Sequence, residues 1–230
     1  MTGNVDRAPQ PLRRVFASVA LAATLAASVA SAQQVWRAGD PARGAALAAA
    51  CAGCHGEHGA APIPGTPALA SQQPEFLMLQ LVLMREGLRD VPAMTGTLKG
   101  LNDRDLVDIA TYYGAARPFS SPPARDPALY ARGEMLSGAM GCNSCHMGDY
   151  SGQRQVPRLV NQREDYLAAA LRAYRDDRRS GTDTSMNAVM YKAVDSDIAA
   201  IAHYLAQRTA GSADSPSTKA TKASPGAGAR

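Results

Sequence analysis

Aromatic residues are scarce in this sequence, where phenylalanine, tryptophan and tyrosine together make up 5% of the 230 residues. Alanine and glycine are abundant instead, although 46% of all residues are apolar. Aromatic side chains normally supply much of the buried volume of a core, whereas alanine and glycine supply little. The composition therefore predicts that something other than side chains fills part of the interior.

The central part of the chain also lacks an excess of either charge. The formal net charge is +4, and it comes entirely from the two ends of the chain, in equal parts from positions 1–32 and 209–230. The stretch between them, 33–208, contains equal numbers of basic and acidic side chains. Nucleic-acid binding calls for a basic patch on a folded face or for a basic arm. The basic balance of the whole chain therefore does not indicate a nucleic-acid partner, and none is predicted.

Patterns of strands and of common catalytic centres are missing as well. No segment alternates cleanly between apolar and polar residues, and no Ser/His/Asp set, phosphate-binding glycine motif or paired-carboxylate site is evident. Helix signals are frequent, and Asp-Pro pairs at 40–41 and 126–127 suit an N-cap followed by a first helical proline. The apolar spacing predicts further helices over residues 74–86, 102–114, 164–175 and 195–206. The predicted fold class is all-α.

The N-terminal segment 1–32 has the layout of a targeting segment. Arginines precede a short, alanine-rich apolar stretch, and residues 30–32 form an A-x-A cleavage pattern. We predict a cleaved signal peptide over residues 1–32, with an uncleaved membrane anchor as the alternative. No later segment is apolar enough to cross a bilayer. At the other end, residues 209–230 contain no bulky apolar side chain and are predicted to be a disordered tail.

Cysteine is scarce too, and all four cysteines lie in two copies of one pattern. Residues 51–55 read CAGCH, and residues 142–146 read CNSCH. In an exported chain four cysteines could form disulfides, and a C-x-x-C pair could be a redox pair or half of a zinc site. The histidine directly after the second cysteine favours a different reading, because C-x-x-C-H is the attachment pattern of c-type haem.

Two thiols of this pattern can form thioethers with the haem vinyl groups, and the adjacent imidazole then faces the iron. We therefore predict two covalently bound haem c groups. The predicted attachment residues are Cys51, Cys54, Cys142 and Cys145, and the predicted iron ligands next to them are His55 and His146.

Both haem motifs lie within a longer repeat whose two copies keep a nearly constant offset. PALASQ at 67–72 matches PRLVNQ at 157–162, and other features recur in the same order. A shared order of this kind indicates a duplicated unit. A proline-rich segment between the copies marks a domain boundary. We predict a first domain over residues 33–116, a linker over 117–126 and a second domain over 127–208.

Each histidine fills one axial position of its iron, and the repeat suggests methionine for the other. Met94 follows His55 at nearly the same spacing as Met186 follows His146. Both methionines also precede the matching aspartate of the last helix by the same interval. We predict Met94 and Met186 as axial ligands in segments expected to be loops, with Met190 as the competitor of Met186.

The residues resemble class I c-type cytochromes, and specifically the di-haem cytochrome c4 family. The resemblance covers nearly all of residues 33–208. It is carried by the two haem motifs, by the P-x-L segments and by the closing helices IATYY at 109–113 and IAHYL at 201–205. It implies two tandem class I cytochrome c domains, each with a His/Met-ligated haem, packed so that the haems lie close together.

The same resemblance implies two further features. The carbonyl groups of Pro67 and Pro157 would accept a hydrogen bond from the haem-ligating histidines, and Gly44 and Gly133 would let the first helix of each domain cross closely over a tyrosine of the last, Tyr112 or Tyr204. The sequence departs from the family's P-x-L-x-G-Q pattern at one position of each copy, where Ser71 and Asn161 replace the usual glycine.

Two ligands per iron leave no open position for oxygen or peroxide, and methionine ligation raises the reduction potential. The predicted function is therefore a di-haem c-type cytochrome, not an enzyme, that carries single electrons between periplasmic or membrane redox partners. The alternative is the cytochrome subunit of a periplasmic dehydrogenase complex, and a di-haem peroxidase or sensor is less favoured. Expected partners are a redox protein donor and acceptor, such as a terminal oxidase or a dehydrogenase. The predicted location is the periplasm, and association with a membrane surface is left open.

Overall fold

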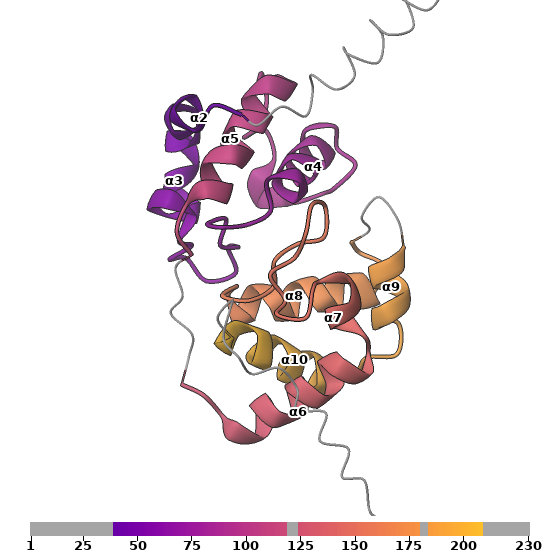
Figure 1. Ribbon diagram of the computed structural model, residues 1–230. Helices are drawn as coiled ribbons and strands as arrows, with labels where there is room; N and C mark the ends of the chain where they lie inside the picture. Colours follow the sequence, from indigo (N-terminus) through magenta and orange to yellow (C-terminus); the bar gives the residue numbers. More distant parts are fainter. Residues whose placement is uncertain (1–38, 119–123, 180–183, 209–230) are drawn as a thin grey trace, which may run out of the picture.

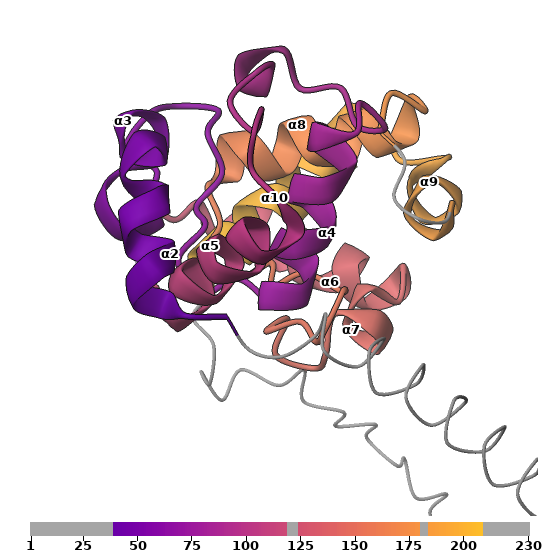
Figure 2. The same ribbon diagram turned by 90° about the horizontal axis from the view of Figure 1, so that it is seen from above.

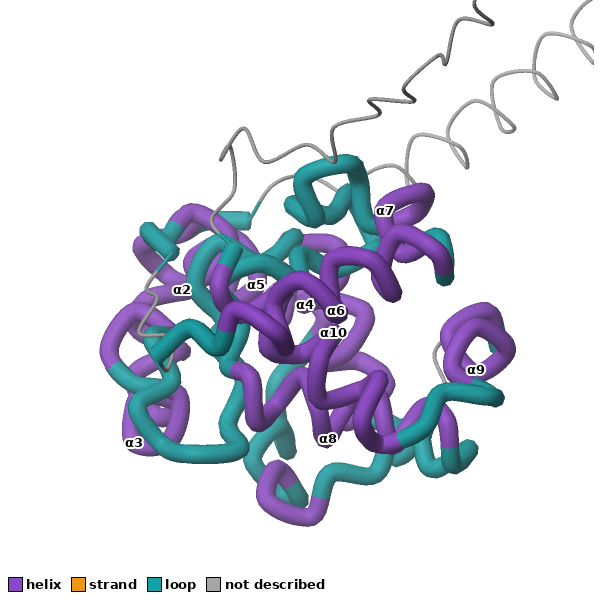
Figure 3. Tube along the Cα trace, turned by 90° about the horizontal axis from the view of Figure 1, so that it is seen from below, coloured by secondary structure: helices purple, strands orange, loops and turns teal. Residues whose placement is uncertain are grey.

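The computed structural model describes residues 39–118, 124–179 and 184–208. Within these ranges the chain is helical and has no β-strand, and strand-like pairing is limited to an isolated bridge between Gln153 and Val156 (Figure 3). The predicted all-α class is confirmed. The signal peptide predicted for residues 1–32 and the tail predicted for 209–230 lie outside the described residues.

The helices form two groups, stacked in Figure 1 and overlapping in the view from above (Figure 2). The first group consists of α2 (Pro41–Ala48), the 3₁₀ helix η1 (Ala49–Cys51), α3 (Ala52–His55), the 3₁₀ helix η2 (Glu57–Gly59), α4 (Pro74–Arg85), the 3₁₀ helix η3 (Pro92–Met94) and α5 (Asp103–Ala115). The second group consists of α6 (Pro127–Ala139), α7 (Cys142–Cys145), α8 (Glu164–Arg175), α9 (Ser185–Met190) and α10 (Asp195–Gln207).

Each group is built around the packing of its first helix on its last, α2 on α5 and α6 on α10, with α4 or α8 against the same last helix. The predicted Asp-Pro starts are confirmed. The side chain of Asp40 accepts hydrogen bonds from the first-turn N–H groups of α2, and that of Asp126 does the same for α6. Asn102 forms a capping box with Asp105 at the start of α5.

Glycine is required where these helices cross. A Cβ atom at Gly44 would lie 2.1 Å from the carbonyl oxygen of Asp108, and one at Gly133 would lie 2.1 Å from the carbonyl oxygen of Ala200. The β-carbon of the tyrosine one turn further along the last helix would be 2.9 Å away in the first group and 2.6 Å in the second. The close crossing expected at both glycines is therefore present.

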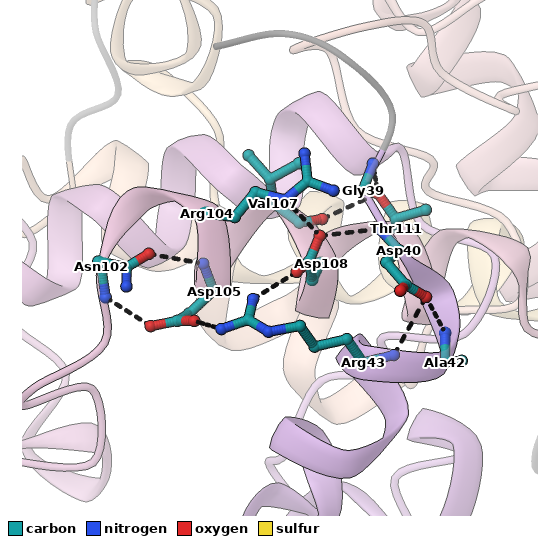
Figure 4. Close-up of polar contacts among 10 residues, drawn as sticks. All are labelled: Gly39, Asp40, Ala42, Arg43, Asn102, Arg104, Asp105, Val107, Asp108 and Thr111. Atoms are coloured by element: carbon teal, nitrogen blue, oxygen red, sulfur yellow. Dashed lines mark hydrogen bonds and ion pairs between the residues drawn. The ribbon is translucent and has the colours of Figure 1, made fainter. Parts of the chain in front are cut away.

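An ion cluster fastens α2 to α5 in the first group (Figure 4). Asp108, whose side chain is fully buried, accepts hydrogen bonds from Arg43 Nη1 at 2.5 Å and from the N–H of Asp40 at 2.8 Å. Arg43 also pairs with Asp105, and Arg104 lies 3.1 Å from Asp108. Burial alone would raise the pKa of Asp108, but the Asp40 N–H and the two guanidinium groups outweigh it and lower that pKa.

Two local expectations differ from the structure. Helix α5 continues to Ala115 instead of stopping at Gly114, because Gly114 does not adopt the positive φ of a helix-ending glycine. This glycine permits close packing instead, since a Cβ there would lie 2.6 Å from Cγ of Pro74 at the start of α4. The segment that holds Met186 and Met190 is not a loop but helix α9.

The two groups contact each other through the loops that follow α3 and α7. Gln73 Nε2 donates to the carbonyl oxygen of Ser151 at 2.9 Å, and Arg163 Nη1 donates to that of Ala61 at 3.2 Å. Gln73 and Arg163 occupy matched positions of the repeat, and each donates to a carbonyl oxygen in a loop of the opposite group. The contact between the groups therefore has approximate two-fold symmetry.

Candidate haem sites

The first haem motif forms a short helical turn with its histidine facing inward. His55 ends α3 and is buried, and its Nδ1 lies 3.0 Å from the carbonyl oxygen of Pro67. A carbonyl can only accept, so Nδ1 carries the proton. Burial lowers the pKa of His55, and the bond to Pro67 offsets this only in part. The imidazole is therefore neutral, with the lone pair of Nε2 available to a metal.

The second haem motif repeats this geometry. His146 is buried at the end of α7, and its Nδ1 donates to the carbonyl oxygen of Pro157 at 2.8 Å. Burial again lowers the pKa of the histidine. The hydrogen bonds that the proline carbonyls were expected to accept from both histidines are therefore present. In metal sites a bond of this kind fixes the tautomer and the orientation of the ring and raises the basicity of the ligand.

The cysteines flank each histidine at two depths. Cys51 and Cys142 are half-buried against the cores of their groups, whereas Cys54 and Cys145 are exposed, and no disulfide joins any of the four. Burial raises the pKa of the inner two thiols. Each motif thus presents one thiol at the edge of the core and one at the surface, on either side of the turn that leads to the histidine.

Met94 and Met186 occupy matching, half-buried positions of the repeat. Met94 ends η3, and Met186 lies in the first turn of α9. Met190 is only 1% exposed and packs in the core with Ala193 and Ile198. Its counterpart in the first group is Leu98, which is 4% exposed. Met190 therefore fills the core position that a leucine fills in the first group, and Met186 is the counterpart of Met94.

An apolar surface joins the cysteine and methionine sides of the second site. Met140, Ala168 and Leu171 are half-buried and pack against two buried clusters at once. One of these clusters is bordered by Cys142 and the other by Met186. A flat, apolar macrocycle fits this distribution, because its burial would cover apolar side chains that the chain itself covers only in part.

Two arginines from opposite groups form a feature that sequence reasoning missed. Arg89 and Arg179 are half-buried and converge on the hydroxyl of Tyr166, which Arg179 Nη1 approaches to 3.3 Å. Neither forms an ion pair with a carboxylate among the described residues, and Arg179 Nε is buried there without a hydrogen-bond partner. Burial and the charge of Arg179 lower the pKa of Arg89.

Such a pair of guanidinium groups suits a carboxylate ligand, and haem carries two propionates. The sequence alone suggests a solvated helix end at residues 176–179, next to the second methionine segment, with a role in docking as the alternative. The sequence contains one indication of this pair, because Arg89 and Arg179 occupy matched positions of the repeat.

His203 is not available as an iron ligand, because both of its ring nitrogens are engaged. Nε2 accepts a hydrogen bond from the N–H of Asp126 at 3.0 Å, and Nδ1 lies 2.9 Å from Glu164 Oε2. The matched residue of the first group, Thr111, likewise accepts a hydrogen bond from the N–H of Gly39 at 2.9 Å. This residue of the last helix thus anchors the chain entering each group.

Two helical units, each with a neutral buried histidine behind a C-x-x-C pair and a half-buried methionine at a matched place further along, define a two-domain c-type cytochrome. The comparisons with known proteins agree. The family model for Cytochrome c matches residues 130–209. A cytochrome c4 of Pseudomonas aeruginosa is 37% identical over 179 residues, which cover 73% of this chain and 88% of the relative.

Two other relatives extend the comparison. A protein of Thiomonas intermedia described as thiosulfate dehydrogenase electron acceptor is 33% identical over 219 residues, covering 91% of this chain and 97% of the relative. The crystal structure of reduced recombinant cytochrome c4 from Pseudomonas stutzeri matches with a TM-score of 0.69 and 32% identity, over 75% of this chain and all of that one.

The chain belongs to the cytochrome c4 family. Its two tandem cytochrome c domains bind two haem c groups covalently, and it is an electron-transfer protein with redox proteins as partners, not an enzyme.

Proposed function

We propose that Cys51 and Cys54 attach the first haem, with His55 and Met94 as its axial ligands. Cys142 and Cys145 attach the second haem, with His146 and Met186 as its axial ligands. The observation that carries the proposal is the pair of neutral histidines, each oriented by a proline carbonyl directly beside its C-x-x-C turn. The half-buried positions of Met94 and Met186, and the core position of Met190, support the choice of methionines.

The haem supplies an iron that alternates between the ferrous and the ferric state. The chain keeps each imidazole in one tautomer and orientation. The position of the histidine ligand would therefore change little when the iron gains or loses an electron. The half-buried apolar residues between Cys142 and Met186 exclude water from the second site. Arg89 and Arg179 bind propionates at the contact between the domains, where their charges have no carboxylate partner among the described residues.

In the proposed organisation a signal peptide (1–32) directs the chain to the periplasm. The first domain (33–116) and the second (127–208) are joined by linker 117–126, and residues 209–230 form a tail. Among the described residues no helix is long and apolar enough to span a membrane. The proposed role is to carry electrons from a donor protein to an acceptor such as a terminal oxidase, without a nucleic-acid partner.

A second candidate role is that of electron-accepting subunit of a periplasmic dehydrogenase. It is favoured by the similarity to the Thiomonas intermedia protein described as thiosulfate dehydrogenase electron acceptor, which extends over 91% of this chain. Stoichiometric co-purification with a dehydrogenase from the native host would favour this role, and isolation of the cytochrome alone with rapid electron transfer to an oxidase would favour the first.

The ligand assignment is tested by three methionine variants of the mature holoprotein. We expect Met94→Ala and Met186→Ala each to remove half of the methionine–ferric charge-transfer band, because each deprives one of two irons of its sulfur. Met190→Ala should keep the whole band and destabilise the second domain by about 2–5 kcal/mol, as truncation of a buried methionine does. The band is read by absorption spectroscopy and the stability by denaturant titration.

Mass spectrometry of proteolytic fragments supplies the control, since it should find one porphyrin on each C-x-x-C-H peptide in all three variants. A full charge-transfer band in Met186→Ala, or half a band in Met190→Ala, would assign the ligand to Met190 instead.

A further inference from the structure

Each haem-ligating histidine is bound to a peptide group whose other end is held by the opposite domain. The carbonyl of Pro67 accepts from His55 Nδ1 at 3.0 Å, and the N–H of the same peptide group, on Ala68, donates to Oε1 of Gln162 at 2.8 Å. Gln162 Nε2 then donates to the carbonyl oxygen of Ala68 at 3.0 Å. A glutamine of the second domain therefore holds both sides of the residue that follows Pro67.

The second site has the same arrangement with the domains exchanged. His146 Nδ1 donates to the carbonyl of Pro157 at 2.8 Å, and the N–H of Arg158 donates to Oε1 of Gln72 at 2.7 Å. Gln72 Nε2 donates to the carbonyl oxygen of Arg158 at 3.0 Å. Both hydrogen-bond chains run from a histidine through one peptide group to a glutamine across the domain boundary.

The two glutamines are fixed in one orientation. Both are buried, and each Oε1 accepts a second bond from the N–H of the next residue, Gln73 or Arg163, at 2.9 Å. Because each Oε1 faces two N–H groups and each Nε2 faces a carbonyl, the amide cannot be flipped without losing all three bonds. We call the bonds from each glutamine to the N–H and carbonyl groups of Ala68 or Arg158 the glutamine clamp. Together with the bond from the next N–H group, they fix the orientation of each amide group.

Hydrogen bonds in such a chain polarise one another. When an amide N–H donates, the carbonyl of the same peptide group becomes a better acceptor, so the bond from the histidine strengthens. A stronger bond at Nδ1 makes the imidazole a more basic ligand and favours the ferric iron. Hydrogen bonding around the ligands is one of the means by which a protein sets a haem potential.

We propose that Gln162 of the second domain tunes the reduction potential of the haem in the first domain, and that Gln72 of the first tunes that of the haem in the second. Both are positioning residues that act through the peptide groups holding His55 and His146. The proposal rests on the ligand assignments of the proposed function. Under this proposal the contact between the domains helps to set both potentials. Separating the domains would remove the bond from the peptide N–H to the glutamine in each of the two hydrogen-bond chains.

The test is a spectroelectrochemical titration of the Gln162→Met and Gln72→Met holoproteins. Methionine keeps the side-chain length but has no amide oxygen, and its thioether sulfur is only a weak acceptor. Haem methyl NMR signals, assigned through contacts to each domain, follow the two haems separately. Gln162→Met should raise the potential of the first-domain haem and leave the other unchanged, and Gln72→Met should do the reverse.

Gln73→Met is the matched control, because Gln73 also crosses the boundary but binds Ser151 and not the peptide behind His146. It should shift neither potential. Amide hydrogen exchange of the wild-type protein provides a measurement that needs no variant: Ala68 and Arg158 should be strongly protected, and this protection should be lost at the residue facing the altered glutamine.

Several results would overturn the proposal: rapid exchange of Ala68 and Arg158 in the wild-type protein, a shift confined to the haem of the mutated domain, equal shifts at both haems, a lowered potential, or lost protection without any change of potential. Failure of the proposed function looks different, since it would appear in the wild-type protein as a missing porphyrin or a missing methionine–ferric band.

Discussion

Replacement of Gly133 by alanine tests the packing on which the second domain is built. Gly133 lies in the middle of α6, where that helix crosses α10. An added Cβ would lie 2.1 Å from the carbonyl oxygen of Ala200, 2.7 Å from its carbonyl carbon and 2.6 Å from Cβ of Tyr204. None of these atoms can be moved by rotating a side chain, so the two helices would have to separate.

The magnitude follows from two opposing effects. Optimal separations between carbon atoms are about 3.5–4.0 Å, so the helices must move apart by roughly 1 Å or more. Overpacking of this kind costs about 1–3 kcal/mol, and the rigid obstacles place Gly133→Ala near the upper end. Alanine gains up to about 1 kcal/mol in helix propensity. The expected net loss is about 2 kcal/mol, which corresponds to roughly 8–16 °C in Tm for a domain of this size.

Thermal unfolding of the holoprotein, followed by circular dichroism and by haem absorbance, measures this loss. Gly138→Ala is the control, because Gly138 lies in the same helix but nothing lies within 4 Å of an added Cβ there. It should leave the protein as stable as the wild type or stabilise it by about 0.5–1 kcal/mol through helix propensity. The reasoning would be refuted if Gly133→Ala were as stable as the wild type, or if both variants lost the same amount.

Two further predictions concern backbone strain and pH. Ser71 and Asn161 have a φ of 59° at the position where the family pattern has glycine. Ser71→Gly should stabilise the protein by about 0.5–1 kcal/mol in denaturant titrations, because relief of about 1–2 kcal/mol of left-handed strain exceeds the roughly 0.5–1 kcal/mol that the greater backbone freedom of glycine costs. Asn161→Gly should stabilise it by less, because asparagine tolerates this conformation better, and a destabilised Ser71→Gly would contradict this. The lowered pKa of Asp108 contributes stability that is present above the unfolded pKa of about 3.9 and is lost as pH falls through the folded value. Asp108→Asn should therefore be less stable than the wild type at pH 7 and lose less stability on acidification to pH 3, whereas an unchanged difference between these two pH values would count against the ion cluster.

Features set by local chemistry could be predicted from the sequence. The Asp-Pro starts of α2 and α6 and the Asn102 cap depend on a few neighbouring residues, and they form as predicted. The histidine-to-proline hydrogen bonds came from the family resemblance and are also present. These features need no knowledge of how the two domains meet.

Features that depend on how the two domains meet, or on which face of a helix is buried, could not be predicted from the sequence. Gln72 and Gln162 stand out in the repeat, but their partners are backbone groups of the opposite domain, which carry no sequence signal. Arg179 stands among charged residues and becomes half-buried only through its neighbours in space. Met186 and Met190 share one segment, and only the packing of α9 shows that Met190 belongs to the core.

The glutamine clamp binds only backbone groups, and this affects how the sequences of the two halves can diverge. Residues 68 and 158 are alanine and arginine, yet each offers the same N–H and carbonyl to its glutamine. A self-complementary junction built on such groups tolerates exchange of the side chains at its centre. The two halves can therefore specialise their outer surfaces toward different partners while the joint between them keeps its geometry.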